Sequence, residues 1–292
     1  MNPPGKTFDV FGLGQCVVDH LALVEEHPPS DEKREVLAWQ RAGGGPVATA
    51  LVALSRWKRA CAIAGVVGDD ADGETLLADF RAEGVDAGRM LVRPDSSSQA
   101  AFVAVERATG RRRIYWRRPT GAPPRLEEID PPPARLFLTD GLWADISVAC
   151  ARRATCTVVD AGTLREGTEA LIPEADVFVA SESFARAYMG GDDPEGCCRR
   201  LREAGVRIAG VTLGARGYVA SFEDRTYRAP AHPAEVVDTT GCGDIFHAGL
   251  CEGLLADWPL ERTFEFAAWA AAQAATALGG RAGIPIGPPP VR

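Results

Sequence analysis

The chain has 292 residues and a formal net charge of -8 at pH 7, with 46% hydrophobic and 25% charged residues. This length allows one large α/β domain with a small appendage, and the composition is ordinary for a soluble globular protein. The negative charge argues against nucleic acid as a main partner, because that affinity depends on neutralising phosphates. The eight cysteines form no C-x-x-C pair and the four histidines are scattered, so the sequence shows no zinc-ligand spacing.

The first residues contain no apolar signal core, and no stretch approaches about 18 uninterrupted apolar residues. We therefore expect a cytoplasmic protein with reduced thiols and no membrane partner.

The first half of the chain alternates apolar runs with glycine-rich breaks. In chain order we predict a strand at Phe8–Leu13, a helix at Val47–Leu54, a strand at Cys61–Val67, a helix at Gly73–Glu83, and strands at Ala100–Glu106 and Arg112–Trp116. Residues 108–111 suit a hairpin turn between the last two strands. Gly43-Gly44-Gly45-Pro46 precedes the first helix, and glycines there either let the backbone approach a ligand or form a plain tight turn.

From residue 134 onward, apolar strands alternate with helical segments. The predicted strands are Arg135–Thr139, Thr157–Asp160, Val177–Ala180 and Ile208–Leu213, and a late helix covers Phe264–Leu278 before Gly279-Gly280 stops it. Repeated strand–helix units of this length are typical of a parallel sheet covered by helices on both faces. The sequence therefore predicts an α/β fold.

The most informative segment is 238–249, which reads Asp-Thr-Thr-Gly-Cys-Gly-Asp-Ile-Phe-His-Ala-Gly. A Gly-x-Gly turn is followed by Asp244 and then by a helical apolar pattern, so free N–H groups of Gly241, Cys242 and Gly243 would gather at a helix start, where anions bind. A carboxylate beside a phosphate site suggests a base that deprotonates a hydroxyl during phosphoryl transfer. An ordinary helix start capped by Asp244 is the alternative. We expect His247 to pack beneath the turn.

This segment resembles the D-T-x-G-A-G-D signature of the ribokinase (PfkB) family of sugar and nucleoside kinases, with Cys242 at the usual Ala position. Other family motifs are similar, in order, to residues 14–19 (G-x-x-x-x-D), 44–50 (a Gly-Gly helix start), 66–73 (V-G-x-D-x-x-G) and 211–217 (T-x-G-x-x-G). The resemblance implies a Rossmann-like three-layer αβα sandwich over residues 1–15, 45–95 and 122–292. It also implies a small β-sheet lid from residues 16–44 and 96–121.

The resemblance further implies ATP and Mg²⁺ as cofactors, K⁺ as a third, and a homodimer that pairs through the lid. The implied acceptor-binding residues are Asp19, Lys33, Gly44, Gly45, Thr49 and Asp140, and the nucleotide-binding residues are Ser181, Thr212, Gly214 and Gly217. Asp238 and Thr240 are candidates for the potassium site, and Glu182 for contact with magnesium. Two positions depart from the family's N-x-x-E element, because Ser181 and Phe184 replace its Asn and Glu. Pro46 and Thr49 likewise stand where many members have Asn.

The acceptor is implied to be a ketose. Residues 35–45 resemble ketohexokinase, whereas 43–46, 238–247 and 279–285 resemble the bacterial sulfofructose kinase branch. Lys33 matches a lid lysine that contacts the sulfonate in that branch, but Leu142 stands at the matching Arg position, which disfavours a sulfonate. The alternatives are a nucleoside kinase, with Trp39 or Trp116 as a stacking surface, and a sugar-binding regulator that lost catalysis. The arginines at 111–113 and 117–118 either grip an anionic substituent or lie on a solvated hairpin.

Overall fold

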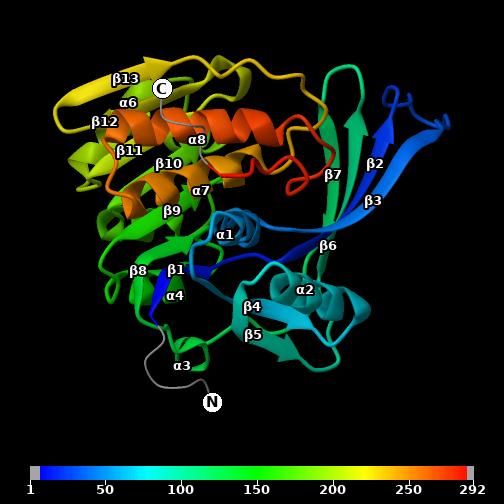
Figure 1. The fold of residues 1–292 in the computed structure, drawn as a ribbon, viewed down its shortest axis with the longest axis horizontal. Helices are drawn as coiled ribbons and strands as arrows, with labels where there is room; N and C mark the ends of the chain where they lie inside the picture. The colour runs from blue at the N-terminus through cyan, green and yellow to red at the C-terminus, as the bar shows by residue number, and fades with distance from the viewer. Residues whose placement is uncertain (1–6, 288–292) are drawn as a thin grey trace.

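The computed structural model describes residues 7–287, whose strands form two separate sheets (Figure 1). Residues 1–6 and 288–292, which the sequence assigns to the α/β domain, lie outside the described residues. The larger sheet has nine strands in the order β13-β12-β11-β10-β9-β8-β1-β4-β5. Their bounds are β1 Phe8–Leu13, β4 Cys61–Gly68, β5 Asp86–Arg93, β8 Ala134–Thr139, β9 Thr157–Ala161, β10 Val177–Ser181, β11 Ile208–Thr212, β12 Tyr218–Phe222 and β13 Arg225–Ala229. All pair in parallel except β12 and β13, which form an antiparallel edge.

Helices cover both faces of this sheet, because its apolar strands alternate their side chains between two cores. On one face, Val10, Ile63 and Val179 pack against α1 (Pro46–Arg56), α2 (Ala71–Ala82), α7 (Cys242–Leu255) and α8 (Leu260–Ala274). On the other, Phe11 and Phe178 pack against α3 (Leu126–Ile129), α4 (Ala144–Ala151), α5 (Glu182–Met189) and α6 (Pro194–Glu203). The predicted three-layer αβα sandwich is confirmed.

The second sheet, the lid sheet, lies beyond the carboxyl end of β1 (Figure 1). Its strands, in the order β3-β2-β6-β7, are β3 Val36–Gly44, β2 Val17–Val24, β6 Gln99–Glu106 and β7 Arg112–Arg117. Its inner face buries Leu21, Ala101 and Val103 beside Leu278 of the larger domain. Its outer face exposes Trp39, Phe102 and Tyr115, whose rings lie in a row with centroids 5.8 and 6.5 Å apart. The lid sheet is thus apolar on both faces, and only one of them is covered.

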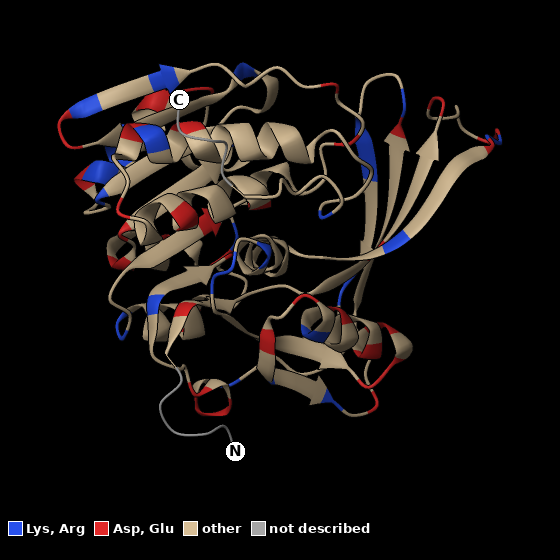
Figure 2. Cartoon of the chain, in the orientation of Figure 1, with Lys and Arg blue, Asp and Glu red and all other residues tan. Residues whose placement is uncertain are grey.

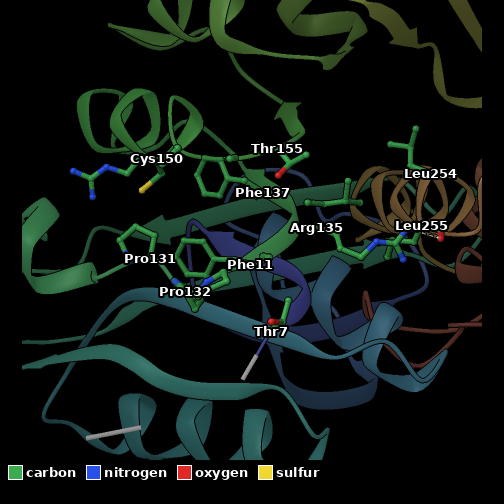
Figure 3. A pocket seen from close by; sticks show the side chains of 15 residues that line it. Thr7, Phe11, Pro131, Pro132, Arg135, Phe137, Cys150, Thr155, Leu254 and Leu255 are labelled. Atoms are coloured by element: carbon green, nitrogen blue, oxygen red, sulfur yellow. Dashed lines mark hydrogen bonds between the residues drawn. The ribbon is translucent and has the colours of Figure 1, made fainter. Parts of the chain in front are cut away.

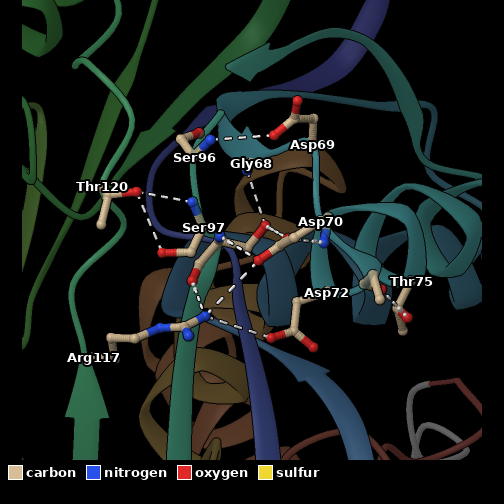
Figure 4. Close-up of polar contacts among 12 residues, drawn as sticks. Gly68, Asp69, Asp70, Asp72, Thr75, Ser96, Ser97, Arg117 and Thr120 are labelled. Atoms are coloured by element: carbon tan, nitrogen blue, oxygen red, sulfur yellow. Dashed lines mark hydrogen bonds and ion pairs between the residues drawn. The ribbon is translucent and has the colours of Figure 1, made fainter. Parts of the chain in front are cut away.

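Charged side chains anchor the lid sheet to α2. Basic residues on β7 and β3 lie near acidic residues of α2 (Figure 2), and Arg117 reaches Asp70 and Asp72 at 3.8 and 3.7 Å (Figure 4). Asp70 caps α2 by accepting from the Gly73 N–H at 2.9 Å, and it also accepts from the Ser98 N–H and hydroxyl at 2.9 and 2.6 Å. The start of α2 therefore fixes where the β6–β7 hairpin leaves the main domain.

The described residues also enclose a cavity of about 650 Å³, lined by Phe11, Phe137, Leu254 and Leu255 among others (Figure 3). It opens at the amino ends of β1 and β8 and at the last turn of α7. Because α7 has 14 residues and is about 21 Å long, this cavity lies far from the helix start that carries Asp244. No helix among residues 7–287 is long and apolar enough to cross a membrane.

The strand and helix predictions differ from the structure in several places. Strands β2 and β3 were expected only as part of the lid region 16–44, without bounds, and β5, β12 and β13 were not predicted. The edge strands β5 and β13 are only partly buried and lack a continuous apolar run. The late helix starts at Leu260 and ends at Ala274, instead of covering Phe264–Leu278. It ends early because the carbonyl of Ala275 accepts the N–H groups of Val237 and Asp238 at 2.8 and 3.2 Å, which ties the helix end to the 238–249 segment.

Candidate active site

The turn before α7 requires glycine at its first position. Gly241 has φ 78, and a Cβ there would lie 2.5 Å from the Cα of Gly280. Gly243 is exposed, and nothing lies within 4 Å of the position of its missing Cβ. Gly280 therefore supports the turn from behind, while its front remains open.

The N–H groups of this turn are largely free. Those of Gly241, Gly243 and Asp244 donate to no group among residues 7–287, whereas that of Cys242 makes a long bond of 3.4 Å to the Thr239 carbonyl. The predicted N–H group of Cys242 therefore carries this one long bond, and the N–H group of Asp244, which was not predicted, is free. Three unpaired donors at a helix start form an anion-binding site.

The Asp244 carboxyl is partly exposed and accepts no hydrogen bond from the described residues. Burial raises its pKa above the usual range of an aspartate, and the charges of Asp160, Asp19 and Asp140 raise it further, whereas Arg112 lowers it. A carboxylate with a raised pKa is suited to take a proton near neutral pH. Asp244 thus has the environment of a general base rather than that of a helix cap.

Behind the turn lies a buried pair, His247 and Asp160. The Nδ1 atom of His247 lies 2.8 Å from the Gly243 carbonyl and 3.2 Å from a carboxylate oxygen of Asp160, and Nε2 lies 3.3 Å from the Val179 carbonyl. His247 therefore packs beneath the turn. Asp160 was missed in the sequence, although its place at the carboxyl end of a buried parallel strand is where such folds hold ligands.

Asp19 and the glycines of β3 form the other side of the site. Asp19 lies on the inner face of β2, and a Cβ at Gly44 would come within 2.1 Å of its carboxylate. Gly45 has φ 100, and a Cβ added there would lie 2.2 Å from the Gln15 carbonyl oxygen. Burial raises the pKa of Asp19 to about 6, against the lowering effect of Arg281. Arg281, which the sequence analysis missed, is buried behind Gly43, and its Nε and Nη2 have no partner among the described residues.

Three predicted acceptor-binding residues do not present a free group to this site. Thr49 is 1% exposed within α1. Both carboxylate oxygens of Asp140 are occupied, one by the Gln15 N–H at 2.8 Å and the other by the Leu142 N–H at 3.0 Å. Lys33 is exposed in the loop between β2 and β3, beyond Val24 and away from Asp19.

The predicted nucleotide-binding residues lie together at the carboxyl ends of β10 and β11, where Ser181 and Thr212 are paired. The Ser181 hydroxyl caps α5 by accepting from the Phe184 N–H at 3.0 Å. Gly214 and Gly217 have φ 58 and 85, and a Cβ at Gly217 would lie 1.9 Å from the Ala229 carbonyl. These glycines shape the turn that follows β11.

The predicted metal ligands are occupied by protein groups. Glu182 pairs with Arg186 and Arg216 at 2.5 and 2.9 Å. Asp238 accepts from the N–H and hydroxyl of Thr240, both at 2.8 Å, and from the Gly279 N–H at 2.9 Å. Residues 7–287 contain no group of three His, Cys, Asp or Glu side chains that could hold a metal. These side chains therefore do not fit a resident metal, and Mg²⁺ would have to arrive bound to nucleotide phosphates.

A three-layer α/β domain with a β-sheet lid, a carboxyl without partners and an anion-binding helix start define the ribokinase-like class of kinases. The pfkB family carbohydrate kinase model matches residues 8–287, so the chain belongs to this family, whose members are phosphotransferases acting on sugar hydroxyl groups.

Individual relatives match at lower identity. The chain is 27% identical to fructokinase-1 of Oryza sativa subsp. japonica, with 96% of each protein covered. It is 35% identical over 101 residues to the ATP-dependent 6-phosphofructokinase of Thermoanaerobacterium thermosaccharolyticum, over 35% of this chain and 31% of that protein. The chain spans less than half the length of two of the curated relatives it matches. The fold is similar to that of a ribokinase from Thermotoga maritima, at 20% identity and a TM-score of 0.81 over 95% of this chain and 96% of that one.

Proposed function

We propose that this protein is an ATP-dependent kinase that transfers the γ-phosphoryl group to a hydroxyl of a small, ketohexose-like sugar. The observation that supports this most strongly is the carboxyl of Asp244, which has no hydrogen-bond partner among the described residues and lies beside three unpaired N–H groups at the start of α7. A structural aspartate at a helix start would cap those N–H groups instead.

The reaction follows from this geometry. The acceptor hydroxyl oxygen forms a bond to the γ-phosphorus, the bond from that phosphorus to the β–γ bridging oxygen breaks, and ADP leaves with the bridging oxygen. Asp244 takes the hydroxyl proton. In a loose transition state most bond breaking precedes proton transfer, so orienting the hydroxyl matters as much as basicity. The N–H groups of Gly241, Gly243 and Asp244 hold the charge that develops on the phosphoryl oxygens.

Asp19 supports a polyhydroxyl acceptor, because its carboxylate has no hydrogen-bond partner among the described residues and can accept from two neighbouring hydroxyls. The assignment to a ketohexose rests on the resemblance of residues 35–45 and 279–285 to ketose kinases. The structure offers no cation at Lys33 or Leu142 for a sulfonate, since Lys33 lies outside the site and Leu142 has an apolar side chain.

A nucleoside kinase is the second candidate, and one observation favours it. Trp116 is 53% exposed on the inner face, in the same cross-strand row as Asp19, because Ala101 pairs with both residues. A ring at this place could stack on a nucleobase or on the apolar face of a sugar. Trp39 cannot do so, because it lies on the outer face.

We also propose a homodimer that pairs through the outer face of the lid sheet, as the resemblance implies.

A potassium ion beside the turn would need main-chain carbonyl ligands, because Asp238 and Thr240 bond to each other. Adding KCl in steps to an activity assay tests that requirement.

The substrate is tested with a panel of ketoses, aldoses, sulfosugars and nucleosides in a coupled assay of ADP release. We expect the highest kcat/KM with a ketohexose. A preference for adenosine-like acceptors would identify a nucleoside kinase. Binding of a sugar without any consumption of ATP would reject the kinase proposal.

A further inference from the structure

One cation of the lid sheet contacts the catalytic segment. Arg112 extends from the start of β7 and donates a short hydrogen bond to the hydroxyl of Thr239, two residues before Gly241. The Thr239 hydroxyl in turn donates to the Gly110 carbonyl at 3.4 Å. The turn of the β6–β7 hairpin therefore touches the loop that leads into the anion-binding turn.

Strand register separates Arg112 from its neighbours in the basic cluster. Arg112 pairs with Val105 and lies on the inner face, whereas Arg113 pairs with Ala104 and lies on the outer face. Arg117 is bound elsewhere, to the Ser98 carbonyl at 2.9 Å and near the carboxylates of α2. Arg112 forms no ion pair with a carboxylate of residues 7–287, so its charge remains available to a ligand.

The charge of Arg112 reaches the reacting groups. It lowers the pKa of Asp244, of Asp19 and of the Cys242 thiol, each against the raising effect of burial. The other groups that act on Asp244 are the carboxylates of Asp160, Asp19 and Asp140, all of which raise its pKa. Arg112 thus offsets part of the negative charge around Asp244, at the place where a charged phosphoryl group must arrive.

We propose that Arg112 is a further catalytic residue, whose guanidinium contacts the γ-phosphoryl group as it passes from ATP to the acceptor. This inference rests on the proposed function. The guanidinium would exchange its bond to Thr239 for phosphoryl oxygens, so that the moving group is held between the lid sheet and the N–H groups of α7. Arginine suits this role, since its planar fork binds phosphate oxygens in pairs.

The alternative ligand is an anionic substituent of the acceptor. The register argues against it: Arg112 lies four residues along β7 from Trp116, the member of the Asp19 row, which corresponds to about 13 Å. The contact with Thr239 also holds the guanidinium beside the turn, although its charge still reaches Asp19.

The test compares Arg112→Gln and Arg112→Lys with the matched control Arg113→Gln, which removes a neighbouring exposed arginine from the opposite face. We expect Arg112→Gln to lower kcat roughly 10²–10³-fold, as the loss of one donor to a developing negative charge does, with the KM of the acceptor little changed. Arg112→Lys should recover only part of this loss. The acid limb of the kcat profile should move to higher pH in Arg112→Gln, because losing a nearby positive charge raises the pKa of Asp244. Arg113→Gln should behave like the wild-type protein.

A binding measurement separates this inference from the proposed function. Affinity for ADP with aluminium fluoride, which mimics the moving phosphoryl group, should fall in Arg112→Gln, while affinity for ADP alone stays the same. Unchanged kcat, acid limb and aluminium fluoride affinity would overturn the inference. So would a change confined to the KM of an anionic acceptor. If the wild-type protein phosphorylates nothing in the panel, the proposed function fails, and the aluminium fluoride measurement still decides the role of Arg112.

Discussion

At the scale of single residues, Asp160 tunes Asp244. Its buried carboxylate raises the pKa of Asp244, and His247 lies against it from the next turn of α7. Replacing Asp160 by Asn removes this negative charge, so the pKa of Asp244 should fall and the acid limb of the kcat profile should move to lower pH. Rate measurements across that limb check the shift.

Glu252→Gln is the control for this prediction. Glu252 lies on α7, the helix that carries Asp244, but near its opposite end, and it forms a buried ion pair with Arg59. The Glu252→Gln substitution should lower the stability of the protein without moving the acid limb. An acid limb that stays in place in Asp160→Asn would show that Asp160 only supports the helix.

Asp19 should control acceptor affinity. Its pKa is raised to about 6, and only the carboxylate accepts two hydroxyl hydrogen bonds, so the acceptor KM should decrease as pH rises through that value. In Asp19→Asn the acceptor KM should rise by roughly tenfold or more, since a hydrogen bond to a charged group contributes about 1.5–3 kcal/mol. The KM of ATP should stay constant. Equal loss of affinity for both substrates would place Asp19 in a structural role.

The local part of the site could be predicted from the sequence. Asp244, Gly241 and Asp19 could be found because short spacings of glycine and aspartate beside an apolar run have few other uses. Asp160 and Arg281 could not, because they come from distant segments that only the folded sheet order brings together. Arg112 was one of five arginines for which the sequence left two roles open, and the strand register separates it from the others. Asp140 and Glu182 carry suitable side chains, but neighbours that the sequence does not reveal already occupy them.

At the scale of elements, the start of α7 depends on one backbone conformation. Gly241→Ala should destabilise the protein and lower kcat, because alanine is strained at φ 78 and its Cβ would collide with Gly280. Gly243→Ala is the matched comparison: it adds the same methyl group two residues later in open space, and should leave the unfolding temperature unchanged or slightly raised. Thermal unfolding and kcat of both variants check this. Equal stability of the two would show that Gly280 does not support the turn.

The parallel strands other than the edge strand β5 were predictable because each is a short apolar run that is largely buried on both faces. The ends of α8 were not, since the carbonyl of Ala275 is taken by a segment 37 residues earlier in the chain. Strands β12 and β13 pair only with each other and β11, so their assignment needed the tertiary sheet order.

At the scale of the whole molecule, the outer face of the lid sheet carries a row of exposed aromatic side chains. Trp39, Phe102 and Tyr115 are 59%, 39% and 64% exposed there. We expect light scattering to give the mass of a dimer, and Trp39→Glu to give a monomer, because burying an unpaired charge opposes association. Thr109→Glu, in the hairpin turn, adds the same charge away from this face and should leave the dimer intact. A wild-type protein that is monomeric at every concentration would refute pairing through the lid.

The proposed function assigns proton transfer during phosphorylation to the Asp244 carboxyl, and steady-state kinetics of Asp244→Asn test that assignment most directly. Folding raises the pKa of Asp244 to about 8, so the folded wild-type protein holds a proton that the unfolded chain has already lost. The wild-type protein therefore loses stability as pH rises toward this raised pKa, and the neutral variant does not. The variant should therefore unfold at no lower a temperature. We predict a kcat roughly 10²–10⁴-fold below the wild-type value. A well-folded variant that phosphorylates the sugar at the wild-type rate would contradict this assignment.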